Sequence, residues 1–167
     1  PEELFHPVCA EEAFTIKDLT VNPMRISHDA ADPVGYRFSY GSSHAAVCTD
    51  LGTYNDYTVE CLKGMDVLLL EANHDVNMLQ VGSYPYYLKQ RILGNRGHLS
   101  NENSGRLLSR VLHDNLKKVI LGHLSQENNL PELALATSTQ RAEQEGMILG
   151  QDISLDLALR DTVGSVY

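Results

Sequence analysis

Two apolar runs, Asp66-Val-Leu-Leu-Leu-Glu71 and Lys118-Val-Ile-Leu-Gly122, decide the fold class of this chain. Each has the length of a strand and lacks alternation, which is typical of strands buried on both faces of a parallel sheet. The stretch 101–113 between them places leucine and valine side chains on one face of a predicted helix. Strand, helix and strand in this order predict a βαβ unit, and therefore an α/β protein.

The segments around this unit predict strands before it and alternating elements after it. The expected elements are a strand-rich stretch at 14–26, a hairpin joining 35–40 to 44–49, a helix at 55–63, a helix from Pro131 to about 145, and a strand at 153–159. The segment 84–97 has the least regular pattern. Because it is aromatic and basic, it is either a binding loop or lid, or a surface loop that packs its own tyrosines. The whole pattern predicts a layered α/β sandwich in one domain.

Composition narrows the class of protein. Hydrophobic residues make up 43% of the 167 residues and charged residues 21%, as in a globular domain. No apolar run is long enough to span a membrane, and the first residues lack the pattern of a signal peptide, so no membrane association is expected. Three dispersed cysteines fit neither a disulfide framework nor a cysteine zinc site, which predicts a cytoplasmic location.

The net charge of -9 argues against a large nonspecific surface for nucleic acid, because contacts with phosphates need lysine and arginine. It does not exclude a nuclease, since bound metal ions supply positive charge inside a site.

Three potential metal ligands follow predicted strands directly. They are His28, Asp50 and His123. Sites of α/β proteins lie at the carboxyl ends of strands, and imidazole with carboxylate suits zinc, manganese or iron. Each residue also has a structural alternative: Asp50 as a turn former, His123 as a buried core histidine, and His28 as the partner of Asp29 in a surface pair.

Two further histidines are candidates near such a site. His98 precedes the helix predicted from Asn101, where it could donate a proton or hold a phosphoryl oxygen. His74 follows the first apolar run and could lie at the rim of the site. An internal repeat also includes a histidine in each copy, because Gly97-His-Leu-Ser-Asn-Glu-Asn103 recurs as Gly122-His-Leu-Ser-Gln-Glu-Asn128.

These motifs resemble the metallo-β-lactamase superfamily, in its phosphodiesterase and nuclease branch. His28-Asp-Ala-Ala-Asp-Pro-Val-Gly-Tyr36 is similar to the third-motif histidine, Thr49-Asp-Leu-Gly52 to the fourth-motif aspartate, and Leu121-Gly-His-Leu-Ser125 to the fifth-motif histidine. The string around His98 resembles an extra histidine motif of tRNase Z and a cyclic phosphodiesterase. Longer strings, such as Leu70-Glu-Ala-Asn-His-Asp75 and Leu88-Lys-Gln-Arg-Ile92, resemble the bacterial YycJ/WalJ-like proteins.

The resemblance implies an αββα sandwich of two mixed sheets flanked by helices. It implies a metal-dependent phosphodiester hydrolase, with a DNA exonuclease activity, that uses two divalent ions (zinc or manganese). Asp50 would bridge the ions, while His28 and His123 would each complete the ligand set of one of them. A hydroxide formed from metal-bound water would attack phosphorus. Asp50 and His98 are therefore the expected catalytic residues, with His98 acting on the leaving oxygen.

Four other residues receive supporting roles by the same resemblance. Asn73 and His74 would orient the metal ligands from behind. Arg91 and Arg96, together with Lys89, would hold the phosphates of a nucleic acid or other phosphodiester substrate. The alternative for these three cations is that they are solvated loop charges.

One departure from the superfamily is large, because the motif His-x-His-x-Asp-His is absent. Residues 1–167 are therefore expected to be the C-terminal portion of a single metallo-β-lactamase domain, whose partner is the missing N-terminal half. Such a portion would bind metal weakly, would be inactive alone, and could associate with copies of itself through an exposed apolar face. The alternatives are another hydrolase on this fold (a thioesterase, lactonase or glyoxalase) and a non-catalytic binding role.

Overall fold

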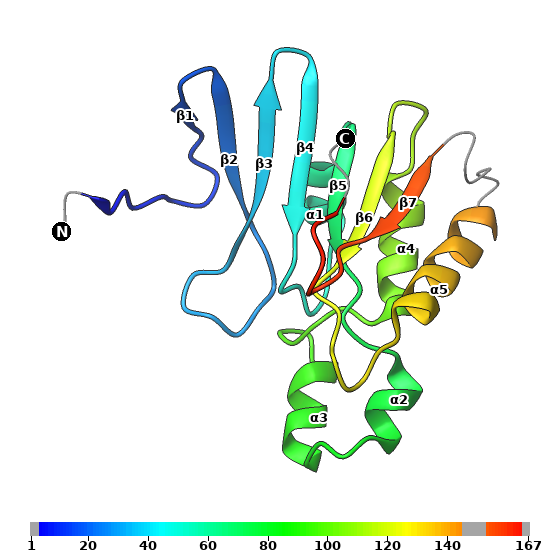
Figure 1. Cartoon of the computed structure of the whole chain (residues 1–167). Coiled ribbons are helices and arrows are strands. Elements are labelled where there is room, and N and C mark those ends of the chain that lie inside the picture. Colours follow the sequence, from blue (N-terminus) through cyan, green and yellow to red (C-terminus); the bar gives the residue numbers. More distant parts are fainter. Residues whose placement is uncertain (1–3, 145–152, 165–167) are drawn as a thin grey trace.

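One mixed sheet carries the fold in the computed structural model, which describes residues 4–144 and 153–164. Within these residues the sheet has seven strands whose order follows the chain (Figure 1). The strands are β1 (Phe14–Ile16), β2 (Leu19–Arg25), β3 (Val34–Tyr40), β4 (Ser43–Cys48), β5 (Val67–Glu71), β6 (Lys118–Gly122) and β7 (Ser154–Leu157). The strands from β1 to β4 form an antiparallel meander, whereas the strands from β4 to β7 are parallel.

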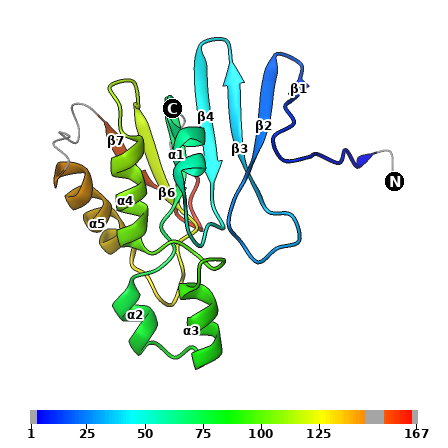
Figure 2. The ribbon, with the colours of Figure 1, turned by 180° about the vertical axis from the view of Figure 1, so that it is seen from behind.

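The described residues contain five helices, which lie on one face of the sheet or beyond the ends of its parallel strands. Helices α1 (Asp56–Leu62), α4 (Asn101–Val111) and α5 (Pro131–Gln144) cover one face, as the two opposite views show (Figures 1 and 2). Helices α2 (Val76–Val81) and α3 (Tyr86–Leu93) lie beyond the carboxyl ends of the strands. None of these helices is long and apolar enough to cross a membrane.

The core lies between the sheet and the three helices of the covered face. Leu68 and Leu70 of β5 point into it and are fully buried, and Leu107 and Leu108 of α4 pack there as well. Side chains alternate across a strand, so Leu69 lies on the opposite face, where it is only half-buried. The prediction that β5 is buried on both faces therefore holds for only one face within the described residues. These residues also contain no second sheet that could cover the other face.

Most predicted elements are present within a few residues of the expected bounds. The β6 strand and the starts of α4 and α5 are placed as predicted. At α1, the Asn55 side chain accepts a hydrogen bond from the Thr58 backbone N–H, and the Thr58 side-chain oxygen accepts one from the Asn55 N–H. This capping box explains why so short a helix forms at this point.

The prediction of an irregular segment at 84–97 is wrong, because Tyr86–Leu93 form helix α3. Pro85 stands at its N-cap, where the missing N–H of proline is not needed by the helix. The Lys89 ammonium donates hydrogen bonds to the carbonyls of Gln80 and Gly82 at the end of α2. The two helices are thereby tied into one lobe by contacts with carbonyls seven and nine residues earlier in the chain, which the pattern within 84–97 does not reveal.

Candidate metal centre

Chain turns at the strand ends aim the candidate ligands into one cavity. Asp50 follows β4 and His123 follows β6, and both adopt left-handed backbone conformations, with φ of 59° and 58°. Such a conformation costs a residue other than glycine roughly 1–2 kcal/mol. At both positions it occurs just beyond the end of a strand. Strained backbone of this kind clusters at functional sites.

The Asp50 carboxylate lies at the centre of three imidazoles. Its Oδ1 is 3.7 Å from Nε2 of His28, 3.7 Å from Nε2 of His123 and 3.9 Å from Nδ1 of His98. The ring centroid of His98 lies 5.1 Å from that of His28 and 5.2 Å from that of His123. The structure thus brings together the four residues that the sequence assigned to metal binding and catalysis.

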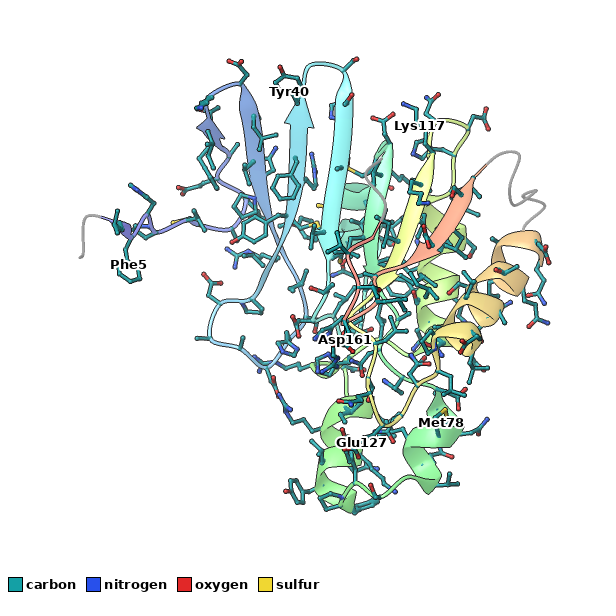
Figure 3. All side chains as sticks on the ribbon, in the orientation of Figure 1. Phe5, Tyr40, Met78, Lys117, Glu127 and Asp161 are labelled. Atoms are coloured by element: carbon teal, nitrogen blue, oxygen red, sulfur yellow. The ribbon has the colours of Figure 1, made fainter. Side chains whose placement is uncertain are left out.

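An open cavity of about 490 Å³ contains this group. Leu88, Arg91 and Ile92 of α3 form one part of its wall, and Glu127 forms another. In Figure 3, Glu127 lies beside α3, beyond the ends of the strands. The cavity is therefore bounded by the strand ends on one side and by the α2–α3 lobe on the other.

Glu71, which the sequence analysis did not single out, holds the site from beneath. It is fully buried at the carboxyl end of β5. Its Oε1 accepts hydrogen bonds from Nδ1 of His98 (2.8 Å) and of His123 (2.7 Å). Its Oε2 accepts from the backbone N–H of Leu51 (2.7 Å) and of Leu99 (3.3 Å). The sequence did contain a signal for this role, because Glu71 is a charged residue at the end of an otherwise apolar strand. Charged residues that are buried need partners, so such a residue indicates a buried polar contact.

The hydrogen bonds keep Glu71 ionised despite its burial. Burial raises the pKa of this carboxyl, but hydrogen bonds from His123, His98 and the Leu51 N–H outweigh it, and the pKa is lowered overall. The same hydrogen bond raises the pKa of His123 against the opposing effect of burial. Glu71 is thus a buried anion that fixes two imidazole rings.

The Nδ1 atoms of His28 and His123 are both occupied by oxygen acceptors. Nδ1 of His28 donates to the Gly97 carbonyl at 3.1 Å, while Nδ1 of His123 donates to Glu71. Each ring therefore presents Nε2 towards Asp50. Metal-binding histidines usually show this arrangement, with the second ring nitrogen donating to a carboxylate or carbonyl.

The donor set fits divalent metal ions. Two ligand atoms at about 2.1 Å from one tetrahedral ion lie roughly 3.4 Å apart, which is close to the separations around Asp50. Asp50, Glu71, His98 and His123 each offer a ligand atom within 4.8 Å of the others. Since the two Glu71 oxygens already accept four hydrogen bonds, we regard Glu71 as an orienting group rather than a ligand.

Gly97 sets the position of His98 through a close backbone approach. A Cβ atom at Gly97 would lie 2.2 Å from the carbonyl oxygens of Arg91 and Ile92, so no larger residue fits. The His98 N–H donates to the Ile92 carbonyl at 3.0 Å. The end of α3 therefore fixes both His98 and the carbonyl that holds His28.

The two copies of the repeat pack around the residues that follow β5. His98 and His123, at equivalent positions of the copies, share the Oε1 atom of Glu71. Asn101 of the first copy and Asn129, the residue directly after the second copy, exchange two side-chain hydrogen bonds of 2.8 and 2.9 Å. The repeat therefore supplies a matched pair of histidines to one carboxylate.

The remaining predicted residues lie at different distances from the site. The Asn73 side chain donates to the His123 carbonyl at 2.8 Å. His74 is buried, and neither ring nitrogen has a hydrogen-bond partner among the described residues. Burial lowers its pKa to about 4. Arg91 lines the cavity in a bidentate ion pair with Asp29, and Arg96 donates to the His28 carbonyl.

Asn73 and Arg96 are therefore placed to hold the backbone of two candidate ligands, and Arg91 to face a bound molecule. His74 does not line the cavity.

The candidate metal ligands thus lie just beyond the ends of strands in a mixed sheet, and comparison with known proteins gives the family. The chain belongs to the metallo-β-lactamase superfamily, since the β-lactamase superfamily domain matches residues 1–124. It is 40% identical over 141 residues to exodeoxyribonuclease WalJ of Streptococcus pneumoniae serotype 2 (strain D39 / NCTC 7466), in agreement with the predicted family. That match covers 84% of this chain and 52% of the relative, so the chain spans about half the length of that relative.

Solved structures show the same fold at low sequence identity. The metallo-β-lactamase fold protein YhfI from Bacillus subtilis has a TM-score of 0.63 at 15% identity. The match covers 90% of this chain and 51% of the YhfI chain. Zn²⁺-bound PqqB from Methylobacterium extorquens has a TM-score of 0.61 at 16% identity, and covers 90% of this chain and 52% of its own. The described sheet and helices thus have a metallo-β-lactamase fold, a fold that implies divalent metal ions.

Proposed function

We propose that this chain provides the substrate-facing half of a two-metal phosphodiester hydrolase that acts on nucleic acid, in the manner of an exonuclease. The observation that carries the proposal is the convergence of His28, Asp50, His98 and His123 on one open cavity, with two Nε2 atoms facing one carboxylate oxygen. The relative named exodeoxyribonuclease supports DNA as the substrate.

Asp50, His28 and His123 would hold the metal ions, zinc or manganese. Bound there, divalent ions would lower the pKa of water and so supply a nucleophile near neutral pH. His28 and His123 stay in the tautomer that leaves Nε2 available, because Gly97 and Glu71 accept their Nδ1 protons.

His98 would act on the leaving oxygen. Glu71 accepts a hydrogen bond from Nδ1 of this ring and holds it close to the rings of His28 and His123. A protonated imidazole at this point can donate a proton as the phosphodiester bond breaks. Arg91 in the cavity wall would contact a phosphate oxygen, and its pair with Asp29 limits how far it can move.

The residues of this chain supply only part of the ligands of two metal ions. We therefore propose that the 167-residue chain alone binds metal weakly and does not turn over. Turnover by this chain alone, at the rate of the longest form that its gene encodes, would contradict that.

The main test is the substitution Asp50→Ala, made in the longest form that the gene encodes. We expect loss of bound metal, measured by mass spectrometry, and loss of hydrolysis of DNA and of bis-p-nitrophenyl phosphate. Asp56→Ala is the matched control, since this carboxylate lies exposed on α1 and pairs only with Arg110 among the described residues. Retention of both metal and hydrolysis by Asp50→Ala would refute the assignment.

A substrate panel separates this proposal from the other activities of the fold. Faster turnover of a thioester or a lactone than of phosphodiesters would favour the alternative hydrolases. Absence of both metal and turnover in the longest form would favour a non-catalytic role.

A further inference from the structure

Helix α3 forms the wall of the cavity that faces away from the sheet. Tyr84, Leu88, Arg91 and Ile92 line the cavity, and all come from this helix or its approach. Figure 1 shows the α2–α3 lobe projecting beyond the strand ends. A long substrate that enters the cavity can therefore contact this lobe.

Two neighbouring tyrosines of α3 are exposed but point in different directions. Tyr86 is 76% and Tyr87 74% exposed. Tyr87 lies four residues before Arg91, so the two share one helix face, and Arg91 lines the cavity. The residues one turn beyond Tyr86 are Lys89 and Gln90, and neither lines the cavity, whereas one of the two residues one turn beyond Tyr87 is Arg91, which does. Tyr87 thus continues the cavity wall outward, whereas Tyr86 does not.

Arg91 has donors to spare at this wall. Its Nε and Nη2 atoms donate to Asp29, which fixes the plane of the guanidinium group. Its Nη1 atom has no hydrogen bond with any residue in 4–144 or 153–164. A rigid guanidinium with unused N–H groups suits a phosphate oxygen. Because the Asp29 carboxylate offsets the positive charge of Arg91, electrostatic attraction between Arg91 and a phosphate would by itself bind nucleic acid weakly.

We infer that Tyr87, assisted by Tyr84, stacks on unpaired bases of a single-stranded nucleic acid whose reacting phosphodiester lies in the cavity. Aromatic rings bind single strands in this way, because every base has an exposed face once it is unpaired. Four residues, or about 6 Å along the helix axis, separate Tyr87 from Arg91. That spacing exceeds the roughly 3.4 Å axial step between phosphates of one strand in duplex DNA, so it accommodates one or two nucleotides.

This inference rests on the proposed function but is tested by binding alone. The probe is a fluorescent single-stranded oligonucleotide with hydrolysis-resistant phosphorothioate linkages, titrated with the longest form that the gene encodes and followed by anisotropy. We expect Tyr87→Ala to raise Kd by about 5-fold to 150-fold, the range that corresponds to one lost base stack. Tyr87→Phe keeps the ring and should stay within about twofold of the parent chain.

Tyr86→Ala is the matched control, because it removes the same side chain from the adjacent, equally exposed position. We expect its Kd to be unchanged, and a duplex probe to bind more weakly than the single strand in the parent chain. Equal losses in the Tyr86→Ala and Tyr87→Ala variants, a Tyr87→Phe variant as weak as Tyr87→Ala, or tighter binding of duplex would overturn the inference. Failure of hydrolysis with an intact Tyr87 effect would instead count against the proposed function alone.

Discussion

Replacing Glu71 by glutamine tests the organisation of the metal centre. Glutamine has the same shape, but its amide offers one oxygen acceptor in place of the two that together accept four N–H groups in the parent. In one orientation the amide NH₂ faces the N–H groups of Leu51 and Leu99. Each buried donor that loses its acceptor costs about 1–3 kcal/mol, so the free energy of unfolding falls by about 2–6 kcal/mol.

In the other orientation the amide NH₂ faces the imidazoles. His98 and His123 must then accept at Nδ1 and carry their proton on Nε2, the atom that His123 presents to Asp50. The fold loses less stability, but the proposed metal ligand His123 no longer presents a free Nε2. Removing a group that orients a metal ligand lowers metal affinity by about 10- to 100-fold.

Two measurements on the Glu71→Gln variant cover both orientations. One is urea unfolding at pH 7, and the other is a zinc or manganese titration by calorimetry. Glu60→Gln is the control, since the Glu60 side chain is 67% exposed and pairs with Lys63 at the surface. If Glu71→Gln leaves the free energy of unfolding within about 0.5 kcal/mol of the control and the metal affinity within about twofold, the assigned role of Glu71 is wrong.

Three further substitutions test the framework around the site. Gly97→Ala forces a Cβ to within 2.2 Å of two backbone oxygens, and we expect it to lower the free energy of unfolding by at least about 1–3 kcal/mol. Gly164→Ala is its control in thermal unfolding, since a Cβ at Gly164 meets open space and should leave the transition unchanged. Leu70→Ala should lower the free energy of unfolding by about 2–5 kcal/mol, because this side chain is fully buried; a smaller loss in urea titration would contradict the core described. A hydrogen bond from Lys117 lowers the pKa of Asp66 below 3.8. The ionised Asp66 carboxylate therefore stabilises the fold fully above pH 3.8, and this stabilisation is lost as the pH falls through the lowered pKa. The stability difference between the parent and Asp66→Asn should therefore shrink between pH 5 and pH 2, and a constant difference would exclude this origin.

The sequence predicted the elements whose signals are local. The apolar run of β6, the N-cap of α1 and the proline that opens α5 depend on nearby residues only, and each element lies where its pattern placed it. The positions of His28, Asp50 and His123 just beyond strands also indicated one site, since parallel strands end at the same edge of a sheet.

The α3 helix and the role of Glu71 could not be predicted in the same way. Helix α3 is anchored by Lys89, whose ammonium reaches carbonyls at the end of another helix. Glu71 belongs to an apolar strand, and its partners come from loops that follow three other segments of the chain. Neither set of partners is adjacent in sequence, so no local pattern shows them.

The sequence by itself determined which residues can bind metal and at which strand ends they lie. Only the tertiary structure decided their orientation: a buried Glu71 holds two imidazoles, the Gly97 carbonyl holds a third, and Asp50 faces all three. The physical reason is that ligand type and strand position are local properties, whereas the tautomer and direction of each ring depend on acceptors that the fold brings from distant segments.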